Sequence, residues 1–432
     1  MIDLGTRLEL FVDHYLVERL AGARLELQRP VLMPPEPGRS RVCYSTVLLD
    51  DGLYRRYQRQ VRPGYRGEQL DGHPGELTCY LESDDGIRWR RPSLGLVEVN
   101  GSAANNVVLA GTDMCSHNFT PFIDRNPAVR PAGRYKALGG VHVGGGLFAW
   151  HSRDGVRWRK VQAGPVITSR NFAFDSQNVA FWSTVEQQYV CYFRTWQTQH
   201  GHLRTISRCT SPDFVHWSEP VPMEPNLPGE HLYTSGTHPY FRAPHLYVAL
   251  PTRFVPDRGE STDILFMTSR AGSTRFDRTF AGAFIRPGLD PARWGNRANY
   301  AAWHVVPTSA EEMSVYVSDR RYTLRTDGFA AVHAAGRGEV LTRPFTFAGG
   351  QLVLNYATSA AGSVRVEVRD ALSRPLPGYA LRRCLPVVGD QVERVVAWQG
   401  GSDLSALAGR PVRLRLVLED ADLYSLRFRP QS

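Results

Sequence analysis

The eight residues ESDDGIRW (82–89) recur along the chain, and this repeat decides the fold. HSRDGVRW (151–158) and TSPDFVHW (210–217) keep Ser, Asp and Trp at the same offsets, and two weaker copies, TSRAGSTRF (268–276) and LRTDGFAAV (324–332), follow. Equivalent positions in the five copies lie 69, 59, 58 and 56 residues apart: Asp85, Asp154, Asp213, Ala271 and Asp327. A period of this length is typical of repeat architectures. We therefore expect five copies of one structural unit.

Each unit shows the pattern of a small antiparallel sheet. Short β-type runs such as TVLLDDGLYRRYQRQV (46–61) and ELTCYLES (76–83) precede the motif, with Asp-Gly or similar turn residues between them. Helical periodicity is nearly absent between residues 40 and 335. Five four-stranded units predict an all-β protein whose residues 1–337 form a five-bladed β-propeller. Asp13, near the N-terminus, is expected on a strand that helps to close the ring.

The repeated motif itself is interpreted as structural. Asp and Gly suit the hairpin turn between the outer strands of a blade, and Ser can bond to nearby backbone groups. The Trp is expected to pack against the next blade. Asp85, Asp154 and Asp213 are therefore not candidates for catalysis.

A second all-β domain is predicted over residues 338–432. From GEVLTRPFTFAGG (338–350) to PVRLRLVLEDADLYSLRFRP (411–430), apolar and polar residues alternate in short runs separated by Gly, Ser and Pro. This pattern is typical of a β-sandwich. Within GGSDLSALAGRPV (400–412), Ser-Asp before a short apolar run predicts one helical turn.

Composition narrows the class of protein. With 432 residues, 42% of them hydrophobic, the chain can bury a large core and fits two domains. The net charge of +9 comes from arginines scattered singly or in pairs, which favours a solvated surface over a nucleic-acid interface. The six cysteines show no pairing pattern and are expected to be reduced and buried. No signal-like or membrane-spanning run is found, so a cytoplasmic protein without a membrane partner is expected.

The stretch NFAFDSQNVAFW (171–182) locates the expected pocket. Four polar residues, 175–178, interrupt an otherwise apolar segment that we expect to form the first strand of the third blade from residue 174 to 182. First strands surround the propeller axis, so polar residues at their starts converge on one central pocket. The corresponding starts in the other blades lie near 44–46, 117–118, 230–231 and 296–300, with overhanging loops that carry further polar groups such as Glu68, Asp71 and His142.

Paired carboxylates in such a pocket indicate cleavage of glycosidic bonds. One acid protonates the leaving oxygen while the other acts as base or nucleophile at the anomeric carbon. The catalytic candidates are Asp175, Glu230 and, more weakly, Glu76. The substrate-binding candidates supply amides, imidazoles, guanidinium groups and aromatic faces for a sugar: His117, Asn118, Gln177, Arg194, Trp196, His231, Arg253, Asn299 and Tyr300.

Structural roles are open for the same residues. Asp175 could accept backbone N–H bonds at a strand entry, Glu230 could be a solvated acid in a loop, and single histidines are often structural. No spacing of His and Cys resembles a zinc site, and no cofactor is expected, although a central calcium ion is an option.

The repeat and the domain order resemble a known group of enzymes. Five blades, the S-x-D-G-x-x-W hairpins SDDGIRW and SRDGVRW, and a β-sandwich after the propeller are similar to the five-bladed glycoside hydrolases of families 32, 43, 68 and 117. The order of domains is most similar to family 32. Arg194 in YFRTW is not followed by the Asp of that family's Arg-Asp-Pro motif, which indicates a divergent branch.

The resemblance implies an exo-acting hydrolase of a small oligosaccharide or glycoside, such as a fructosidase or arabinofuranosidase. Two alternatives are open. One is a propeller that binds carbohydrate without catalysis, since fold does not fix function. The other is a sugar phosphorylase or lyase that uses the same pocket, for which Arg194, Arg253 and Arg297 are available.

Overall fold

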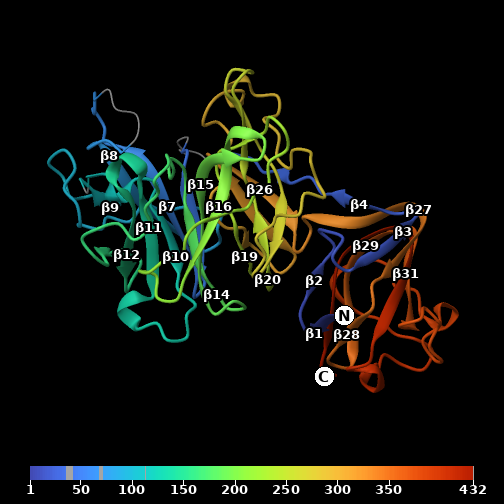
Figure 1. The fold of residues 1–432 in the computed structure, drawn as a ribbon. Coiled ribbons are helices and arrows are strands. Elements are labelled where there is room, and N and C mark those ends of the chain that lie inside the picture. The colour runs from blue at the N-terminus through green and yellow to red at the C-terminus, as the bar shows by residue number, and fades with distance from the viewer. Residues whose placement is uncertain (36–41, 68–71, 112, 432) are drawn as a thin grey trace. The chain divides into compact units, whose positions relative to one another are not determined.

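The computed structural model describes residues 1–35, 42–67, 72–111 and 113–431 and is all-β (Figure 1). The described residues contain no α-helix and no helix that could span a membrane. Short 3-10 turns are the helical segments of this part of the chain: η1 (Asp113–Ser116), η2 (Pro131–Gly133), η3 (His142–Gly144), η4 (Pro291–Arg293), η5 (Leu381–Arg383) and η6 (Ser405–Leu407). The last of these confirms the helical turn predicted within residues 400–412.

Contacts divide the chain into two compact units. The ring unit consists of Pro30–Ser309 and Met313–Thr323, and the long-strand unit of Met1–Arg29, Ala310–Glu312 and Leu324–Ser432. These bounds differ from the predicted 1–337 and 338–432 at both ends of the propeller. The difference arises because the first 27 residues supply β1 to β4 to the same sheet as the C-terminal strands.

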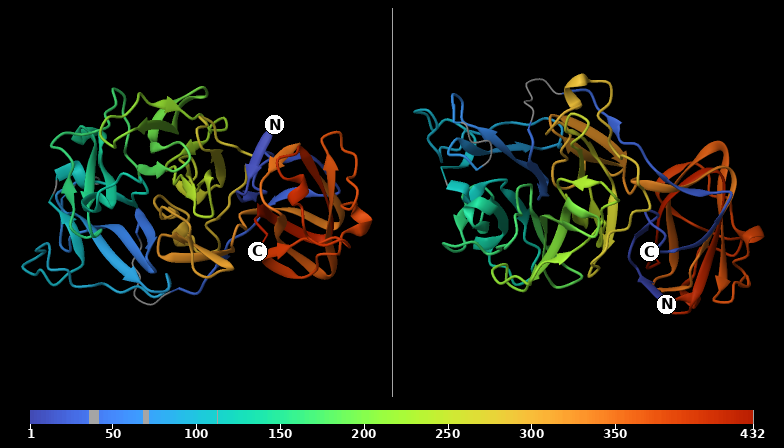
Figure 2. Two further views of the ribbon diagram at one scale, coloured as in Figure 1. Left: turned by 90° about the horizontal axis from the view of Figure 1, so that it is seen from below. Right: turned by 45° about the horizontal axis from the view of Figure 1, so that its top comes forward.

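The ring unit is a β-propeller of antiparallel sheets that follow one another around a common centre (Figure 2). Three consecutive four-stranded sheets come first: β6 (Ser45–Asp50), β7 (Leu53–Val61), β8 (Glu76–Ser83) and β9 (Val107–Ala110); β10 (Thr120–Ile123), β11 (Tyr135–Val141), β12 (Gly146–Ser152) and β13 (Arg159–Lys160); β14 (Val179–Ser183), β15 (Gln188–Thr198), β16 (Gly201–Ser211) and β17 (Val221–Pro222).

The remaining strands of the ring unit are less regular. Residues 231–270 form two three-stranded sheets: β18 (His231–Leu232), β21 (Thr252–Val255) and β22 (Ser261–Ile264); β19 (His238–Tyr240), β20 (Ala243–Ala249) and β23 (Met267–Arg270). The last sheet contains β24 (Val306–Pro307), β25 (Glu312–Val317), β26 (Arg320–Arg325) and β5 (Val31–Leu32). Because residues 231–270 do not form a single sheet, the number of blades stays a prediction.

The first strands close into a ring. β6 contacts β10, β10 contacts β14, β14 contacts β19, and β24 contacts β6. Trp303, just before β24, joins the two ends: its N–H donates to Ser45 O over 2.8 Å, and its own carbonyl accepts from Val47 N over 3.0 Å. Its buried indole also donates to Thr237 O over 2.9 Å, next to β19. One residue therefore links the first, fourth and fifth repeats.

The last sheet is completed by a strand from the N-terminal side. β5 pairs with β26, which places Val31 opposite Thr323. Asp13 was expected to help close the ring, but it lies between β2 and β3 in the long-strand unit, so this prediction is wrong. The fifth motif copy also departs from the repeat. The carboxylate of Asp327 accepts from Ser425 Oγ and Asn355 Nδ2 within the long-strand unit.

The first three motif copies share one hairpin geometry, which confirms their structural interpretation. In the second copy, Ser152 Oγ accepts from Gly155 N over 2.9 Å, and Asp154 Oδ1 accepts from the N–H groups of residues 156 and 157. The first and third copies repeat these bonds around Asp85 and Asp213. The carboxylates are thus engaged in turn formation.

In the first two motif copies the Trp packs on the preceding sheet, not on the next one as expected. Trp158 meets Tyr57 of β7 edge-on, with ring centroids 6.1 Å apart, and Trp89 meets Tyr316 of β25 at 5.8 Å. Tyr57 and Tyr316 also donate their hydroxyl protons to the motif carbonyls of Gly155 and Gly86. The hairpins therefore hold successive sheets together.

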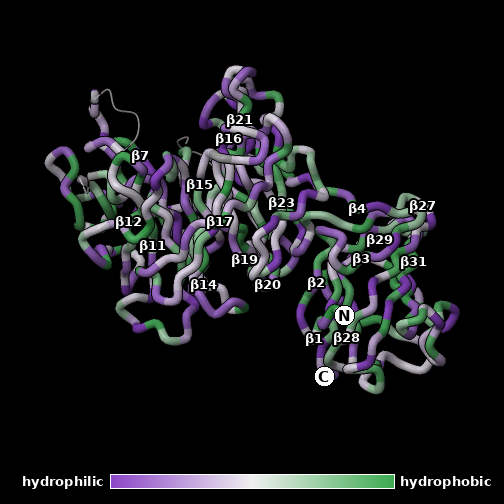
Figure 3. Tube along the Cα trace, viewed as in Figure 1, coloured by the Kyte–Doolittle hydropathy of each residue, from purple (hydrophilic) through white to green (hydrophobic). Residues whose placement is uncertain are grey.

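The long-strand unit is one network of nine strands around its own core. Its strands are β1 (Ile2–Gly5), β2 (Glu9–Leu10), β3 (Val17–Ala21), β4 (Arg24–Leu27), β27 (Ala330–Thr342), β28 (Phe345–Phe347), β29 (Gln351–Asp370), β30 (Asp390–Val395) and β31 (Val412–Arg429). Hydrophobic and hydrophilic residues alternate along parts of β29 and β31 (Figure 3). A two-layer sandwich within this sheet network stays a prediction.

Replacing Trp303 tests the ring closure. Trp303→Phe keeps an aromatic ring but removes the indole N–H, so the buried Thr237 carbonyl loses its donor. We expect a loss of about 1–3 kcal/mol of unfolding free energy, measured by urea titration. The matched control is Trp294→Phe, which removes a similar indole–carbonyl bond on the surface and should have little effect. Equal losses in the two variants would contradict the linking role of Trp303.

The hairpin aspartates predict a pH dependence of stability. Partial burial acts to raise the pKa of Asp154, but the backbone N–H groups of residues 157 and 156 and the Arg157 side chain outweigh it and lower the pKa to about 2. The stabilisation is therefore complete above the ordinary pKa and is lost as the pH falls toward about 2.

Asp154→Ala should cost about 1–2 kcal/mol at neutral pH, with a smaller difference from the wild type near pH 3. The unfolding free energy of Asp154→Asn, which keeps an acceptor oxygen, should lie between those of the wild type and Asp154→Ala. Urea titrations at both pH values measure this, and a pH-independent difference would contradict the assignment.

Candidate functional site

Three tyrosines from the first, fourth and fifth repeats meet where the first strands begin. The ring centroids of Tyr44 and Tyr300 are 5.2 Å apart, and those of Tyr233 and Tyr300 are 5.5 Å apart. Burial raises the pKa of all three phenols, and the neighbouring tyrosines add to the effect for Tyr44 and Tyr300. The phenols therefore keep their protons at neutral pH, and the hydroxyl group of Tyr300 is buried.

Asp175 and Arg194 form an ion pair beside these tyrosines. The distance from Arg194 Nη2 to Asp175 Oδ2 is 2.9 Å, and the side chains are 1% and 23% exposed, respectively. The guanidinium carbon of Arg194 lies 4.9 Å from the Tyr233 ring centroid. Phe174, with a positive φ of 70°, donates its N–H to Arg194 O and so turns the chain toward Asp175. We call Tyr44, Asp175, Arg194, Tyr233 and Tyr300 the axial cluster.

The polar residues after Asp175 anchor this loop. β14 begins at Val179, later than the predicted residue 174, so residues 174–178 form a loop ahead of the strand. Asn178 Nδ2 donates to the carbonyls of Phe174 and Ser176, and Gln177 Nε2 donates to Ser45 O over 2.9 Å. The amides hold a buried loop in place, while Asp175 keeps partial access to solvent.

A second arginine stacks against aromatic rings at the edge of the axial cluster. The guanidinium carbon of Arg204 lies 4.4 Å from the Trp196 centroid, 4.6 Å from Phe254 and 5.1 Å from Tyr233. The Arg204 N–H donates to His231 Nδ1 over 3.2 Å. Burial, followed by the charge of Arg204, lowers the pKa of His231, so this imidazole is neutral at neutral pH.

Aromatic groups also surround Arg194. Phe172 lies 5.9 Å from the Arg194 guanidinium carbon and is 45% exposed, and His142 packs on its ring at 5.4 Å. Trp196 stacks on His202 at 4.8 Å. An exposed aromatic face beside polar groups suits the CH groups of a sugar.

Glu76 belongs to a network that reaches the axial cluster through Arg59. Glu76 accepts from His117 Nδ1 at 2.8 Å and pairs with Arg59 at 2.8 Å. Burial acts to raise the pKa of Glu76, but His117 and Arg59 outweigh it, so the pKa is lowered. Arg59 also donates to Asn118 Oδ1 and lies over the Tyr44 ring. Glu76 is therefore a charged group that holds Arg59, which does not suit a proton donor.

Glu230 lies in a different ion-pair network. Arg278 contacts both of its carboxylate oxygens, at 2.7 and 3.2 Å, and the N–H of Leu227 donates to Oε2. Arg253 approaches Glu230 at 4.0 Å but makes its main pair with Asp263. The contacts of Glu230 and those of Asp175 thus have no member in common among the described residues.

Asn299 is the clearest correction to the predicted binding residues. Its side chain is fully buried: the oxygen accepts from Arg293, and the amide nitrogen donates to Arg293 O and Thr262 O. These bonds stabilise the turn that leads to Tyr300. The amide oxygen and nitrogen are therefore both engaged within the protein and are not available to bind a sugar.

The predicted set is therefore only partly brought together. Five of the predicted residues lie in or beside the axial cluster: Asp175, Arg194, Trp196, His231 and Tyr300. The side chains of His117, Asn118 and Gln177 bond to neighbouring protein groups and so support this region. Glu68 and Asp71 lie outside the described residues. Arg59, Arg204 and Tyr233 were missed because they lie within or beside strands whose alternating pattern gave no reason to single them out.

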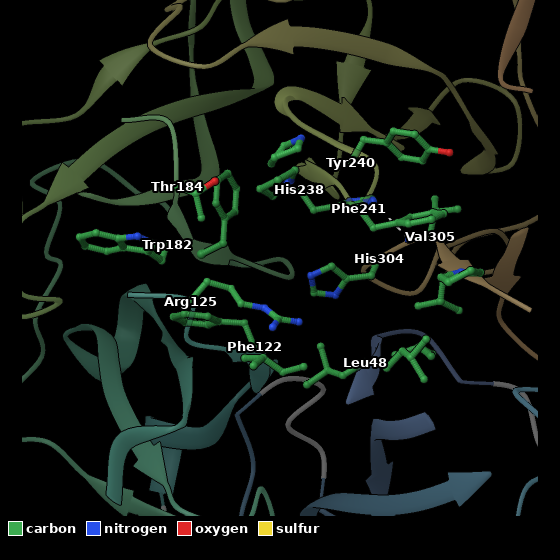
Figure 4. Close-up of a pocket in the computed structure, with 18 residues that line it drawn as sticks. Leu48, Phe122, Arg125, Trp182, Thr184, His238, Tyr240, Phe241, His304 and Val305 are labelled. Carbon is green, nitrogen blue, oxygen red and sulfur yellow. Dashed lines mark hydrogen bonds between the residues drawn. The ribbon is translucent and has the colours of Figure 1, made fainter. Parts of the chain in front are cut away.

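A cavity of about 440 Å³ lies at the other end of the first strands (Figure 4). It is lined by residues near the strand ends, including Leu48, Phe122, Trp182, Tyr240 and His304. Tyr44 and Leu48 are four residues apart, so an extended strand separates the two ends by roughly 13 Å. No carboxylate lines this cavity among the described residues, so it lacks the groups for acid–base catalysis at a glycosidic bond.

Metal binding has no evident centre in the part of the chain that the structure describes. No group of three or more His, Cys, Asp or Glu side chains is placed there to hold a metal ion.

Comparison with known proteins gives similarity at the level of three-dimensional structure. No protein-family model matches the sequence, and no curated protein matches it. A β-1,2-mannobiose phosphorylase from Listeria innocua is similar over 69% of this chain and 93% of its own, with 10% identity and a TM-score of 0.49. An α-L-arabinofuranosidase from Clostridium thermocellum is similar over 65% and 83%, with 14% identity and a TM-score of 0.41.

A further similar structure spans more of the chain. An N-acetylgalactosamine deacetylase from F. plautii, in complex with blood group B trisaccharide, covers 91% of this chain and 95% of its own, with 12% identity and a TM-score of 0.46.

Proposed function

We propose that the protein is a carbohydrate-active enzyme that cleaves a glycosidic bond at the axial cluster. The observation that carries this proposal is the partly exposed carboxylate of Asp175, which is fixed by buried Arg194 and acts electrostatically on the phenols of Tyr44 and Tyr233. In its finer form, the proposal is an exo-acting hydrolase of a small oligosaccharide or glycoside, with a furanoside as the first substrate to test.

Asp175 has the geometry of the base or nucleophile. Its pairing with Arg194 suits a charged carboxylate that accepts a proton from water, or attacks directly, as a bond forms at the anomeric carbon. The phenol groups of Tyr44 and Tyr233 can donate hydrogen bonds to sugar hydroxyls, and Phe172 offers a stacking face. Since the described residues bring no second carboxylate into contact with Asp175, aryl glycosides are the best test substrates: their leaving groups need little protonation.

A second candidate function, phosphorolysis, is favoured by one observation. Arg204 has no carboxylate within ion-pair distance among the described residues and lies beside Asp175 and Arg194. Phosphate could occupy such a position and replace water as the attacking group. The two reactions are distinguished by their products, a free sugar or a sugar 1-phosphate.

Asp175→Asn tests the catalytic assignment. Turnover of a panel of aryl glycosides should fall by about 100-fold or more, while the melting temperature changes little, because the amide still offers an oxygen to Arg194. The matched control is Asp50→Asn, an aspartate paired with Arg134 at the far end of β6, which should keep full turnover. Wild-type turnover in the Asp175 variant would contradict the proposal.

Glu230→Gln separates a structural role from a catalytic one. The neutral amide leaves Arg278 with an uncompensated buried charge, so we expect a loss of about 2–4 kcal/mol in unfolding free energy. The folded fraction should retain turnover within about tenfold of the wild type. Loss of turnover at unchanged stability would instead make Glu230 the second catalytic carboxylate.

A further inference from the structure

A second, half-buried guanidinium group, that of Arg204, lies beside the Arg194–Asp175 ion pair of the axial cluster. Arg194 is almost completely buried, and its Nη2 atom meets Asp175. Its Nε and Nη1 atoms are buried against aromatic rings and have no hydrogen-bond partner. Asp175 is thus its single ion-pair partner in the described part of the chain.

Arg204 has no ion-pair partner at all within the described ranges. Its guanidinium group is held between the rings of Trp196, Phe254 and Tyr233, and its Nε atom is buried without a partner. The charges of Arg194 and Asp175 both act on it electrostatically, which places all three groups in one neighbourhood. Asp175 therefore acts on both guanidinium groups, through an ion pair with Arg194 and electrostatically on Arg204.

An uncompensated charge in an aromatic surrounding is costly. Burial removes hydration from the guanidinium group, and the rings return only part of that free energy. The neighbouring imidazole cannot compensate, because the neutral His231 accepts the backbone N–H of Arg204 and carries no negative charge. A bound anion would restore the balance.

The terminal nitrogens of Arg204 are suited to this role. Its Nε atom is buried among the rings without a hydrogen-bond partner. Nη1 and Nη2 are not buried in this way, and the residue as a whole is half-buried. A planar guanidinium group with both Nη atoms available binds carboxylate, sulfate or phosphate through two parallel hydrogen bonds. The stacking on Trp196 and Phe254 fixes the plane of this group in advance.

We propose that Arg204, with Arg194 behind it, forms an anion subsite of the axial cluster. This inference rests on the proposed function and specifies its substrate: a glycoside whose acidic group lies on Arg204, or a sugar that reacts together with inorganic phosphate. The chemistry in both cases is an oxyanion bound by the terminal nitrogens of Arg204, with the positive charge of Arg194 behind them and the carboxylate of Asp175 in the same neighbourhood.

Calorimetric titration of the full-length protein tests the subsite without relying on turnover. The probes are glucuronate and galacturonate, their neutral parents glucose and galactose, and inorganic phosphate and sulfate. We expect at least one anion to bind about tenfold or more tightly than the neutral sugars. Arg204→Gln should remove that preference, and Arg204→Lys should keep part of it, because lysine retains the charge without the fork. Arg88→Gln, an exposed arginine in a hairpin, should behave as wild type.

The results separate the sources of the anion. Preference for a uronate over its parent sugar assigns the acidic group to the substrate, whereas preference for phosphate, together with faster turnover when phosphate is added, assigns it to a co-substrate. Either preference, lost in Arg204→Gln, supports the subsite. Equal binding of neutral and anionic probes, or anion binding that Arg204→Gln leaves unchanged, would overturn it. Anion binding that persists while no glycoside is cleaved contradicts the proposed function but not the subsite.

Discussion

The ring unit depends on the closure made by Trp303. Its backbone pairs with β6, and its buried indole bonds to the carbonyl of Thr237, so the end of the repeat is joined to both its beginning and its fourth member. Each sheet has its own antiparallel pairs, and bonds between sheets, such as that from Tyr316 to the Gly86 carbonyl, add to the closure that Trp303 makes. The position of Tyr300 relative to Tyr44 and Tyr233 follows from this closure.

The axial cluster is a consequence of that arrangement. Residues 44, 175, 233 and 300 are far apart along the chain, yet each precedes the innermost strand of its repeat. The buried amides of Gln177 and Asn178 position the loop so that Asp175 reaches the axis. The opposite ends of the same strands line a cavity of mostly apolar and aromatic side chains, with Arg125, His238 and His304 and no carboxylate among the described residues. The strand direction thus separates an end that holds a carboxylate from one whose described lining holds none.

Much of the fold could be predicted because the hairpin uses side chains of fixed type. Ser and Asp bond to specific backbone groups, so their spacing marks each turn in the sequence. The unit bounds could not be read in the same way, since residues 1–29 alternate like any strand and pair with partners more than 300 residues away. Asp327 stands at the Asp position of the motif in the sequence, but its carboxylate accepts a hydrogen bond from Ser425 in the long-strand unit. For the site, an expected strand start located Asp175 and an expected overhanging loop located Arg194. Arg204 inside β16 and the Arg278 partner of Glu230 depend on tertiary contacts that no local pattern contains.

The central claim is that a carbohydrate binds at the axial cluster and not at the apolar cavity. The most direct measurement is a crystal structure of the Asp175→Asn variant soaked with a glycoside that the wild type cleaves. We expect the anomeric carbon within about 3–3.5 Å of the substituted side chain at position 175, with the sugar ring near Phe172 and its polar groups near Arg204. A sugar bound among Trp182, Tyr240 and His304, with the axial cluster unchanged, would contradict it.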